Sequence, residues 1–409
     1  MRACLLVLGL TGCTQRVTGA SDAVFPSEVM PVYRLEIEGG TDALAESFDP
    51  LTCEDRPWTR ARLTYENPVT GEDEVYEDVG VRYRGHNVFV EGGTERHGFK
   101  IGMDAFLEDG ELHGLRKVNL LGTEGDPTLL HERLATELMR EAGVPAPRVT
   151  HARLWVDGDY MGVFPNSEES DDKAYLRRAF GDDSGSLYKV KGYCGDRANL
   201  AYIDAMPASY VGTYEPKAGT VEADMTGDLI PFLRCASEPD DSAFGACIDA
   251  HIDRPEWLAE IALDTILPDV DGMAGAGQNF LLHAPDGGRF VVYPWDKDQA
   301  FRPDLARDGV TSLFALSPAW LEGSTPTLVD RLRRVFRPDY CATALEVLDL
   351  YDPARLIPRI DTLEGQLAPG IDDDPFLTQK VWATALDDLR DVVRAQFERA
   401  RAEATACTP

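Results

Sequence analysis

Acidic and amide side chains gather around one predicted β-hairpin in the second half of the chain. Asp271 lies in a Gly- and Ala-rich loop, Asn279 follows eight residues later, and the segment 294–298 reads PWDKD. A tight hairpin would bring Asp271, Asn279 and Asp296 together. Phosphoryl transfer uses this combination, because a carboxylate orients the attacking hydroxyl while carboxylate and carboxamide oxygens hold Mg²⁺. The alternative is that the Asp and Asn residues only form turns and that Trp295 belongs to the core.

The elements that must position these residues follow from hydrophobic periodicity and turn signals. Residues 280–283 and 289–293 flank the turn sequence PDGG, which predicts a hairpin. The apolar period over 255–267 predicts a helix with Asp253 as its N-cap. The charged segment 377–405 predicts a long helix. The second half of the chain is therefore expected to be mainly helical, with the hairpin set into it.

The first half reads as a β-rich region that carries one prominent helix. Strands are predicted over 32–37, 61–65, 79–84, 149–156 and 159–164. The dipeptide Asp157-Gly158 separates the last two and predicts a two-residue turn. Asp126-Pro127 opens the helix, and Gly143 closes it. These patterns predict an α+β fold with a strand-rich N-terminal lobe and a mainly helical C-terminal lobe.

Composition restricts the classes of partner. The 409 residues include 40 Lys and Arg against 71 Asp and Glu, which gives 40 − 71 = −31 at pH 7. At about 150 residues per domain, this length suggests two to three domains or two joined lobes. The negative charge repels nucleic-acid phosphates and anionic lipids, so neither is an expected partner. A cation or a basic protein would be attracted.

Several common catalytic motifs are missing from the sequence. The chain has no G-x-S-x-G nucleophile elbow and no G-x-x-x-x-G-K-[ST] phosphate loop. His131-Glu132 begins like a zinc-protease helix, but Ala135 stands where the second His is needed. The pairing of carboxylates proves nothing by itself in a chain with so many acidic residues.

The first residues resemble an export signal. Met1-Arg2 precedes a short apolar run that ends in Leu10-Thr11-Gly12-Cys13, which is similar to the lipobox of bacterial lipoproteins. The expectation is an exported cell-envelope lipoprotein with Cys13 as the lipidated residue, and the alternative is a Cys within an ordinary signal. The expected organisation is a signal peptide (1–12), a linker (13–29), an N-terminal lobe (30–190) and a C-terminal lobe (191–409).

Six cysteines follow this leader, which suits an exported protein with disulfides. They are Cys53, Cys194, Cys235, Cys247, Cys341 and Cys407. Six thiols allow 15 connectivities, and the sequence does not choose among them. The nearby pair Cys235 and Cys247 is the best candidate for one bridge. A structural zinc site is disfavoured because no two cysteines have the short spacing that zinc sites use.

A series of segments resembles the CotH kinase family, named for bacterial spore coat protein H. The segments, in order, are 81–85 (VRYRG), 98–101 (GFKI), 117–120 (KVNL), 126–145, 155–164 (WVDGDYMGVF), 187–189 (LYK) and 279–301. The similarity covers about residues 30–305. The resemblance implies an atypical protein-kinase-like fold that binds ATP with Mg²⁺ or Mn²⁺ and phosphorylates hydroxyl groups of proteins.

The resemblance also implies roles for individual residues. Asp271 matches the catalytic carboxylate, while Asp296, Asn279 and the weaker candidate Asp298 match the metal ligands. Cofactor contacts are implied for four residues: Lys100 as the phosphate-contacting lysine, Glu168 as its carboxylate partner, Lys189 as a rival lysine, and Arg84. A loop role for Arg84 is less well supported, because His86-Asn87 replaces the Asn-Ser that follows Arg-Gly in the family.

Two main classes of function stay open at this stage, besides a secreted carbohydrate-active or adhesin-like protein that only the export signal and the acidity support. One is an exported protein kinase that transfers the ATP γ-phosphate to Ser or Thr of a protein, with a basic, Ser/Thr-rich substrate matching the acidic exterior. The other is a non-catalytic surface scaffold that keeps the fold. Intact Asp271, Asn279 and Asp296 favour the enzyme.

Overall fold

The computed structural model describes residues 20–49, 56–85, 96–123, 125–192, 195–321 and 326–407. Cys13, the expected lipidation site, lies outside the described residues, as do Cys53 and Cys194. The described part of the chain contains no helix that is long and apolar enough to cross a membrane.

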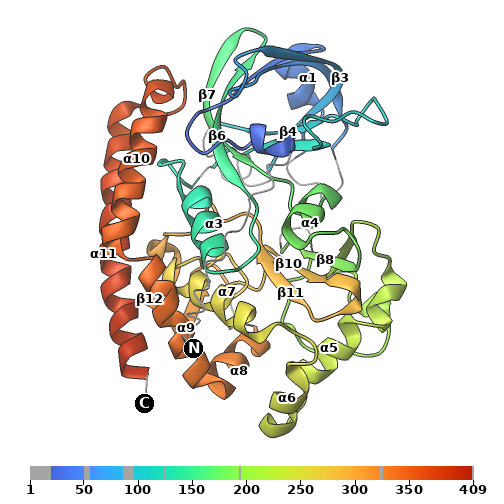
Figure 1. Cartoon of the computed structure of the whole chain (residues 1–409), viewed down its shortest axis with the longest axis vertical. Coiled ribbons are helices and arrows are strands. Elements are labelled where there is room, and N and C mark those ends of the chain that lie inside the picture. The colour runs from blue at the N-terminus through green and yellow to red at the C-terminus, as the bar shows by residue number, and fades with distance from the viewer. Residues whose placement is uncertain are drawn as a thin grey trace, which may run out of the picture.

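The N-terminal lobe is a closed sheet in the order β1-β2-β3-β4-β5-β7-β6 (Figure 1). The strands are β1 (Val32–Ile37), β2 (Thr59–Glu66), β3 (Asp73–Arg84), β4 (Gly98–Gly102), β5 (Lys117–Leu120), β6 (Val149–Val156) and β7 (Asp159–Ser167). Neighbouring strands are antiparallel except at the closure, where β1 pairs with β6 in parallel. The buried faces share one core that includes Tyr33, Leu63, Val81, Phe99 and Phe164.

The predicted hairpin of this lobe is confirmed, with β6 and β7 joined at Asp157-Gly158. Both turn residues have positive φ angles, 51° and 93°, as the two-residue turn requires. The predicted helix appears as α3 (His131–Glu141) and begins later than Asp126. The Asp126 carboxylate accepts hydrogen bonds from the backbone N–H groups of Thr128 (2.9 Å) and His131 (2.8 Å), so it organises the approach to the helix. Two further helices of the first half are α1 (Gly40–Glu46) and α4 (Lys173–Phe180).

A second sheet has the order β11-β10-β8-β9. Its strands are β8 (Ser186–Val190), β9 (Glu215–Lys217), β10 (Phe280–Ala284) and β11 (Val291–Pro294). The predicted hairpin of β10 and β11 is confirmed. The sequence interpretation counted β8 with the N-terminal lobe, but its hydrogen bonds join it to β9 and β10. The change from one sheet to the other therefore lies before residue 186.

Helices surround the second sheet and build the larger core. They are α5 (Leu229–Ala236), α6 (Asp241–Ile248), α7 (Arg254–Ile266), α8 (Thr327–Val335), α9 (Arg337–Leu350), α10 (Pro353–Ile371) and α11 (Gln379–Cys407), with a small hairpin of β12 (Ala306–Ser312) and β13 (Ala315–Pro318). Short 3₁₀ turns lie at Ala20–Ala23, Pro207–Ser209, Glu222–Thr226, Pro285–Gly287 and Pro303–Leu305. The expected helices around 255–267 and 377–405 are α7 and α11. Asp253 precedes α7 as expected but pairs with Arg289 instead of capping the helix. The α+β class is confirmed.

Two disulfides tie helices of the second lobe together. Cys235 and Cys247 form the predicted bridge between α5 and α6. Cys341 and Cys407 form a second bridge, which the sequence did not single out, from α9 to the end of α11. The second bridge fixes the far end of the longest helix to the helical lobe.

The turn between α10 and α11 contacts the N-terminal lobe (Figure 1). Arg96, just before β4, forms a buried ion pair with Asp374 in this turn at 2.5 Å. The same Asp374 carboxylate accepts the backbone N–H of Val163 in β7 at 3.1 Å. The hydroxyl of Tyr160 donates to the carbonyl of Gly370 at 2.8 Å. The helical hairpin therefore holds the closed sheet against the second lobe.

Removing the Arg96 charge should weaken this junction strongly. We expect Arg96→Met to lower the free energy of unfolding by about 3–5 kcal/mol, because it leaves the Asp374 carboxylate buried and uncompensated. Urea denaturation followed by circular dichroism measures the change. Arg394→Met, which removes an exposed ion pair with Asp391, is the matched control and should change little. Equal effects of the two substitutions would contradict a structural role for the buried pair.

Candidate functional site

The hairpin places Asn279 beside the PWDKD segment. In the β10–β11 register Phe280 pairs with Pro294, and the Trp295 backbone N–H donates to the Asn279 carbonyl at 3.1 Å. Asn279 and Asp296 both have φ angles in the left-handed region, 57° and 59°. Asn and Asp tolerate that region better than other non-glycine residues. The chain therefore leaves the ladder at the two residues whose side chains were predicted to bind metal.

Asp271 contacts Asn279 directly. Its Oδ2 accepts a hydrogen bond from the Asn279 Nδ2 at 2.7 Å, and its Oδ1 accepts one from the Gln278 side chain. Burial raises the pKa of Asp271 to about 7, and the charges of Asp269 and Asp296 act in the same direction. A carboxylate with a pKa near the working pH is suited to accept a proton. The predicted approach of Asp271, Asn279 and Asp296 is thus present.

Glu132 of α3 adds a carboxyl group that the sequence interpretation did not assign to this site. It is buried, and its Oε2 accepts the backbone N–H of Lys297. Burial raises the pKa of Glu132 to about 8, with a further contribution from the Asp296 charge. Burial also raises the pKa of Asp298, and the charges of Asp296 and Glu132 add to the effect. The sequence offered only the His131-Glu132 pair, considered there as part of a zinc motif.

Lys297 is the fully buried centre of this region, and the sequence interpretation missed it. Its Nζ lies 2.7 Å from Asp264 of α7 and 2.7 Å from Asp269 in the following loop, with Glu260 at 3.8 Å. Burial alone would lower the pKa of Lys297, but these carboxylates raise it well above its usual range. The other oxygen of Asp269 accepts the backbone N–H of Asp271 at 3.2 Å. Lys297 therefore connects the loop of Asp271 to the loop of Asp296.

Lys100 of β4 forms an ion pair with Glu169, with Nζ and Oε2 2.6 Å apart. The registers explain the contact, because Lys100 pairs with Asn119 of β5 and Asn119 pairs with Ser167 of β7, two residues before Glu169. The Asn119 Nδ2 also donates to Glu169 at 3.1 Å. Burial lowers the pKa of Lys100, although the Glu169 charge opposes the shift.

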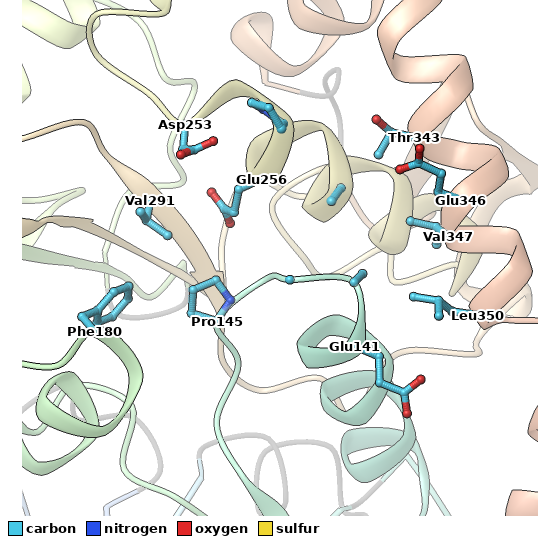
Figure 2. Close-up of a pocket in the computed structure, with 14 residues that line it drawn as sticks. Glu141, Pro145, Phe180, Asp253, Glu256, Val291, Thr343, Glu346, Val347 and Leu350 are labelled. Carbon is cyan, nitrogen blue, oxygen red and sulfur yellow. The ribbon is translucent and has the colours of Figure 1, made fainter. Parts of the chain in front are cut away.

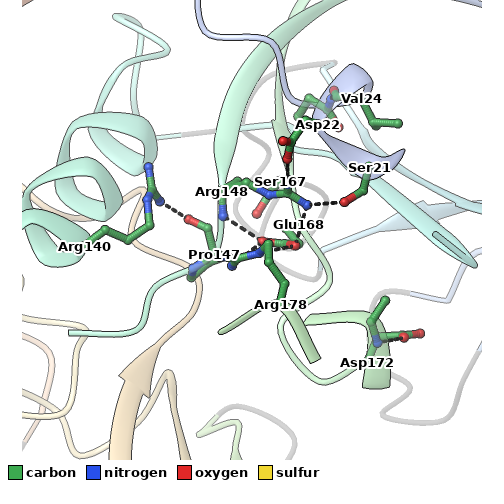
Figure 3. A network of polar contacts seen from close by, with 12 residues as sticks. Ser21, Asp22, Val24, Arg140, Pro147, Arg148, Ser167, Glu168, Asp172 and Arg178 are labelled. Atoms are coloured by element: carbon green, nitrogen blue, oxygen red, sulfur yellow. Dashed lines mark hydrogen bonds and ion pairs between the residues drawn. The ribbon is translucent and has the colours of Figure 1, made fainter. Parts of the chain in front are cut away.

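The prediction that Glu168 is the partner of Lys100 is wrong. Glu168 accepts hydrogen bonds from Arg148 at 2.8 Å and from Arg178 at 2.6 Å (Figure 3). Burial alone would raise the pKa of Glu168, but the charges of the two arginines outweigh it and hold the pKa below its usual range. Side chains of successive residues in an extended chain point to opposite sides, so a shift of one residue exchanges the partners. Glu168 joins β6, α4 and the end of β7.

Lys189 lies beside the same group as Lys100. Its Nζ is 2.9 Å from Asp171 and 4.3 Å from the centre of the Trp295 ring, next to Asp296. Burial alone would lower the pKa of Lys189, but the Asp171 and Glu169 charges raise it. Arg84, at the end of β3, lowers the pKa of both Lys189 and Glu132 through its charge. Lys189 and Arg84 therefore lie near the acidic group through Trp295 and Glu132, while Lys100 shares Glu169 and Asp171 with Lys189.

The donor atoms fit a hard cation bound together with phosphates. Among the described residues, no three His, Cys, Asp or Glu side chains form a ready cluster for a metal ion. Mg²⁺ in phosphate-transfer sites usually takes one or two protein carboxylates and completes its shell with phosphate oxygens and water. Asp296 and Asp298 can supply these two carboxylates, and Asn279 can add a carboxamide oxygen. Burial and, to a smaller extent, the neighbouring acidic charges raise the pKa of Asp298, and a bound cation would offset those charges.

Comparison with known proteins identifies a family and similar individual proteins. The family model described as CotH kinase protein matches residues 81–401. Inner spore coat protein H of Bacillus subtilis (strain 168) is 25% identical over 234 residues, which cover 56% of this chain and 60% of that protein. A solved structure, the HipA, HipB and operator DNA complex of a Shewanella oneidensis MR-1 toxin–antitoxin system, is 13% identical with a TM-score of 0.30. That match covers 72% of this chain and 61% of the other.

Proposed function

Because the chain belongs to the CotH kinase family, we propose that it is a protein kinase that transfers the γ-phosphate of ATP to a Ser or Thr hydroxyl. The observation that carries this proposal is the hydrogen bond between Asp271 and Asn279, formed beside Asp296. A scaffold protein has no need for a buried carboxylate with a pKa near 7 in contact with a metal-ligand side chain. The geometry supports turnover better than a purely structural role.

In the proposed reaction, the acceptor hydroxyl lies against Asp271. The hydroxyl oxygen forms a bond to the γ-phosphorus, the bond between that phosphorus and the β–γ bridging oxygen breaks, and ADP leaves. The hydroxyl proton passes to Asp271, whose raised pKa makes it a competent acceptor at neutral pH. Gln278 and Asn279 hold the two oxygens of this carboxylate and fix its orientation.

The nucleotide would be held by the cationic residues on the opposite side. Lys100, oriented by Glu169, is the proposed phosphate contact, and Lys189 and Arg84 add positive charge nearby. Asp296, Asn279 and Asp298 would hold Mg²⁺ or Mn²⁺, which supplies positive charge to the phosphates. These local charges oppose the repulsion between ATP and a chain of net charge −31.

The acidic exterior supports a basic protein substrate. A net charge of −31 attracts Lys- and Arg-rich segments and increases their rate of encounter, most strongly at low salt. We propose Ser or Thr residues within such segments as acceptors.

Transfer from labelled ATP tests this function. The purified chain is incubated with γ-labelled ATP, Mg²⁺ or Mn²⁺ and a basic acceptor protein, and incorporated label is measured. We expect label with the wild type and a loss of at least 100-fold in Asp296→Ala, whose proposed role is to bind the metal. Asp387→Ala, on the exposed face of α11, removes the same group away from the site and should label normally.

A scaffold would behave differently in the same assay. Absence of label with either metal, together with no shift of the melting temperature on adding ATP, would overturn the kinase proposal. Equal labelling by Asp296→Ala and the wild type would remove Asp296 from the site.

A further inference from the structure

A cavity of about 700 Å³ lies in the second lobe, among the C-terminal end of α3, the start of α7, β11 and α9 (Figure 2). Its walls are largely apolar and include Pro145, Phe180, Val291, Val347 and Leu350. It is separate from the group of Asp271, Asn279 and Asp296. No residue of the proposed catalytic machinery lines it.

Glu256 is a carboxyl group of this cavity that has no positive partner among the described residues. Its Oε2 accepts the backbone N–H of Val292 at 3.2 Å, while its Oε1 is buried and has no hydrogen-bond partner among the described residues. Figure 2 shows the carboxyl group between Asp253, Val291 and Pro145. A buried carboxyl oxygen without a partner loses its hydration and gains nothing in return.

The other acidic groups of the wall divide into paired and unpaired ones. Asp253 pairs with Arg289 at 3.1 Å, and Glu141 pairs with Arg355 at 2.6 Å. Glu346, on the exposed side of α9, makes no ion pair or hydrogen bond with any described residue. The lining residues that the structure describes include no Lys or Arg. The cavity therefore presents two acidic side chains without a basic partner among the described residues, the inner Glu256 and the exposed Glu346, beside apolar walls. Burial raises the pKa of Glu256 well above its usual range, and a bound cation would favour its ionised form.

This combination fits a planar cation on an aliphatic stem. A guanidinium group has several N–H donors for carboxylate oxygens, and its three methylene groups can lie against apolar side chains. The ring of Phe180 offers a face over which a guanidinium can stack. A phosphate or a carboxylic acid would be repelled by the same walls, and a purely apolar ligand would leave the carboxylates unpaired.

We propose that this cavity binds an arginine side chain of the protein substrate, as a docking site apart from the catalytic one. The inference rests on the proposed kinase function. The α7 helix and β11 connect the two sites: Glu256 lies in the first turn of α7, and Asp264, about two turns later, pairs with Lys297. Eight helical residues span about 12 Å. A substrate that reaches both sites must therefore have several residues between the arginine and the acceptor hydroxyl.

Peptide binding tests the site without ATP. A fluorescent peptide with one arginine five residues from a serine is titrated with the full chain, and anisotropy gives its Kd. The same peptide with citrulline in place of arginine keeps the shape but removes the charge. We expect the citrulline peptide to bind at least tenfold more weakly, and Glu256→Gln to weaken only the arginine peptide by a similar factor.

A variant at the surface keeps the site testable even if Glu256→Gln does not fold. Glu346→Lys places a competing cation at the exposed edge of the cavity and should weaken the arginine peptide at least tenfold. Glu398→Lys makes the same change of charge on the exposed face of α11 and should have little effect. Equal weakening by both Lys variants, or equal affinity for the arginine and citrulline peptides, would overturn the proposed site. Spermidine can be added as a competitor of the fluorescent arginine peptide. If it displaces this peptide as well as, or better than, the unlabelled arginine peptide does, the proposed site is also overturned, because the ligand would then be a free amine.

The catalytic proposal can fail independently. If the arginine peptide binds as expected but the wild type never labels an acceptor, the kinase function falls. If the wild type labels acceptors but neither cavity variant changes peptide affinity, the docking site falls and the kinase function stands.

Discussion

Asp271→Asn should transfer phosphate 10²–10⁴-fold more slowly than the wild type while keeping its fold, a range typical of losing a general base. The substitution preserves the size of the side chain and keeps one oxygen that accepts from Gln278 or Asn279, but the amide cannot accept the hydroxyl proton. Initial rates with saturating ATP and acceptor measure the loss. The melting-temperature shift caused by Mg-ATP should persist, because Asp271 is not proposed to hold the nucleotide.

The free energy of unfolding of Asp271→Asn is a second measurement. If Asp271 had only a structural role, its replacement would lower this free energy, whereas the catalytic assignment predicts no change or an increase. Burial and the neighbouring Asp269 and Asp296 charges raise the folded-state pKa of Asp271 to about 7. The folded state therefore binds its proton more tightly than the unfolded state, and this group lowers the stability of the fold as pH rises from about 4 to 7. Removing the charge should leave the free energy of unfolding at pH 8 unchanged or higher. A clear loss of stability together with the loss of rate would contradict the catalytic assignment.

The sequence could predict the contact of Asp271 with Asn279 because both lie close to one hairpin. Turn signals and strand alternation placed β10 and β11, and the tight connection forced Asn279 and Trp295 together. The same local logic predicted the hairpin at Asp157-Gly158 and the bridge of Cys235 to Cys247. Each of these depends on residues no more than 18 positions apart, the separation of Val149 and Ser167 in the β6–β7 hairpin.

Features that depend on contacts between distant segments could not be predicted from local sequence patterns. The parallel pairing of β1 with β6 closes the first sheet between segments more than 100 residues apart, and no local pattern marks it. The choice between Glu168 and Glu169 depends on which side of the extended chain faces β5, and the sequence pattern did not determine that. Glu168 and Glu169 are adjacent residues of the same type, but they form ion pairs with different partners: arginines for Glu168 and Lys100 for Glu169.

Lys297 was overlooked for a related reason. It lies between two predicted metal ligands, Asp296 and Asp298, and a lysine in such an acidic loop is ordinarily expected to be exposed to solvent. Its partners Asp264 and Asp269 approach only because α7 packs beneath the hairpin. An isolated lysine in an acidic loop has many possible environments, and only the tertiary structure shows that this one is fully buried.

The arrangement of charge explains how an acidic chain could hold a nucleotide. Lys100, Lys189 and Arg84 come from different strands, and each lies near carboxylates that keep it in place. Lys297 is different, because its positive charge is neutralised by ion pairs with Asp264 and Asp269 inside the lobe. Its proposed role is to position the loops of Asp271 and Asp296 rather than to contact a ligand.

Lys297→Met should be the most destabilising single change in the site, lowering the free energy of unfolding by about 3–5 kcal/mol. The methionine has a similar length, but Asp264 and Asp269 would remain buried without a cation. The loops of Asp271 and Asp296 would also lose their common anchor, so labelling should fall with stability. Urea denaturation followed by fluorescence measures the first effect, and initial rates at low temperature measure the second.

Matched variants separate positioning from general damage. Lys217→Met removes a half-exposed pair with Glu215 in β9 and should cost little stability. Adding Asp264→Asn and Asp269→Asn to Lys297→Met removes the uncompensated charges and should restore part of the lost stability. Because the anchor between the two loops would still be missing, the triple variant should regain stability without regaining the labelling rate. Full recovery of both would show that Lys297 acts only through charge balance, and no recovery of stability would show that its partners are not what make it necessary.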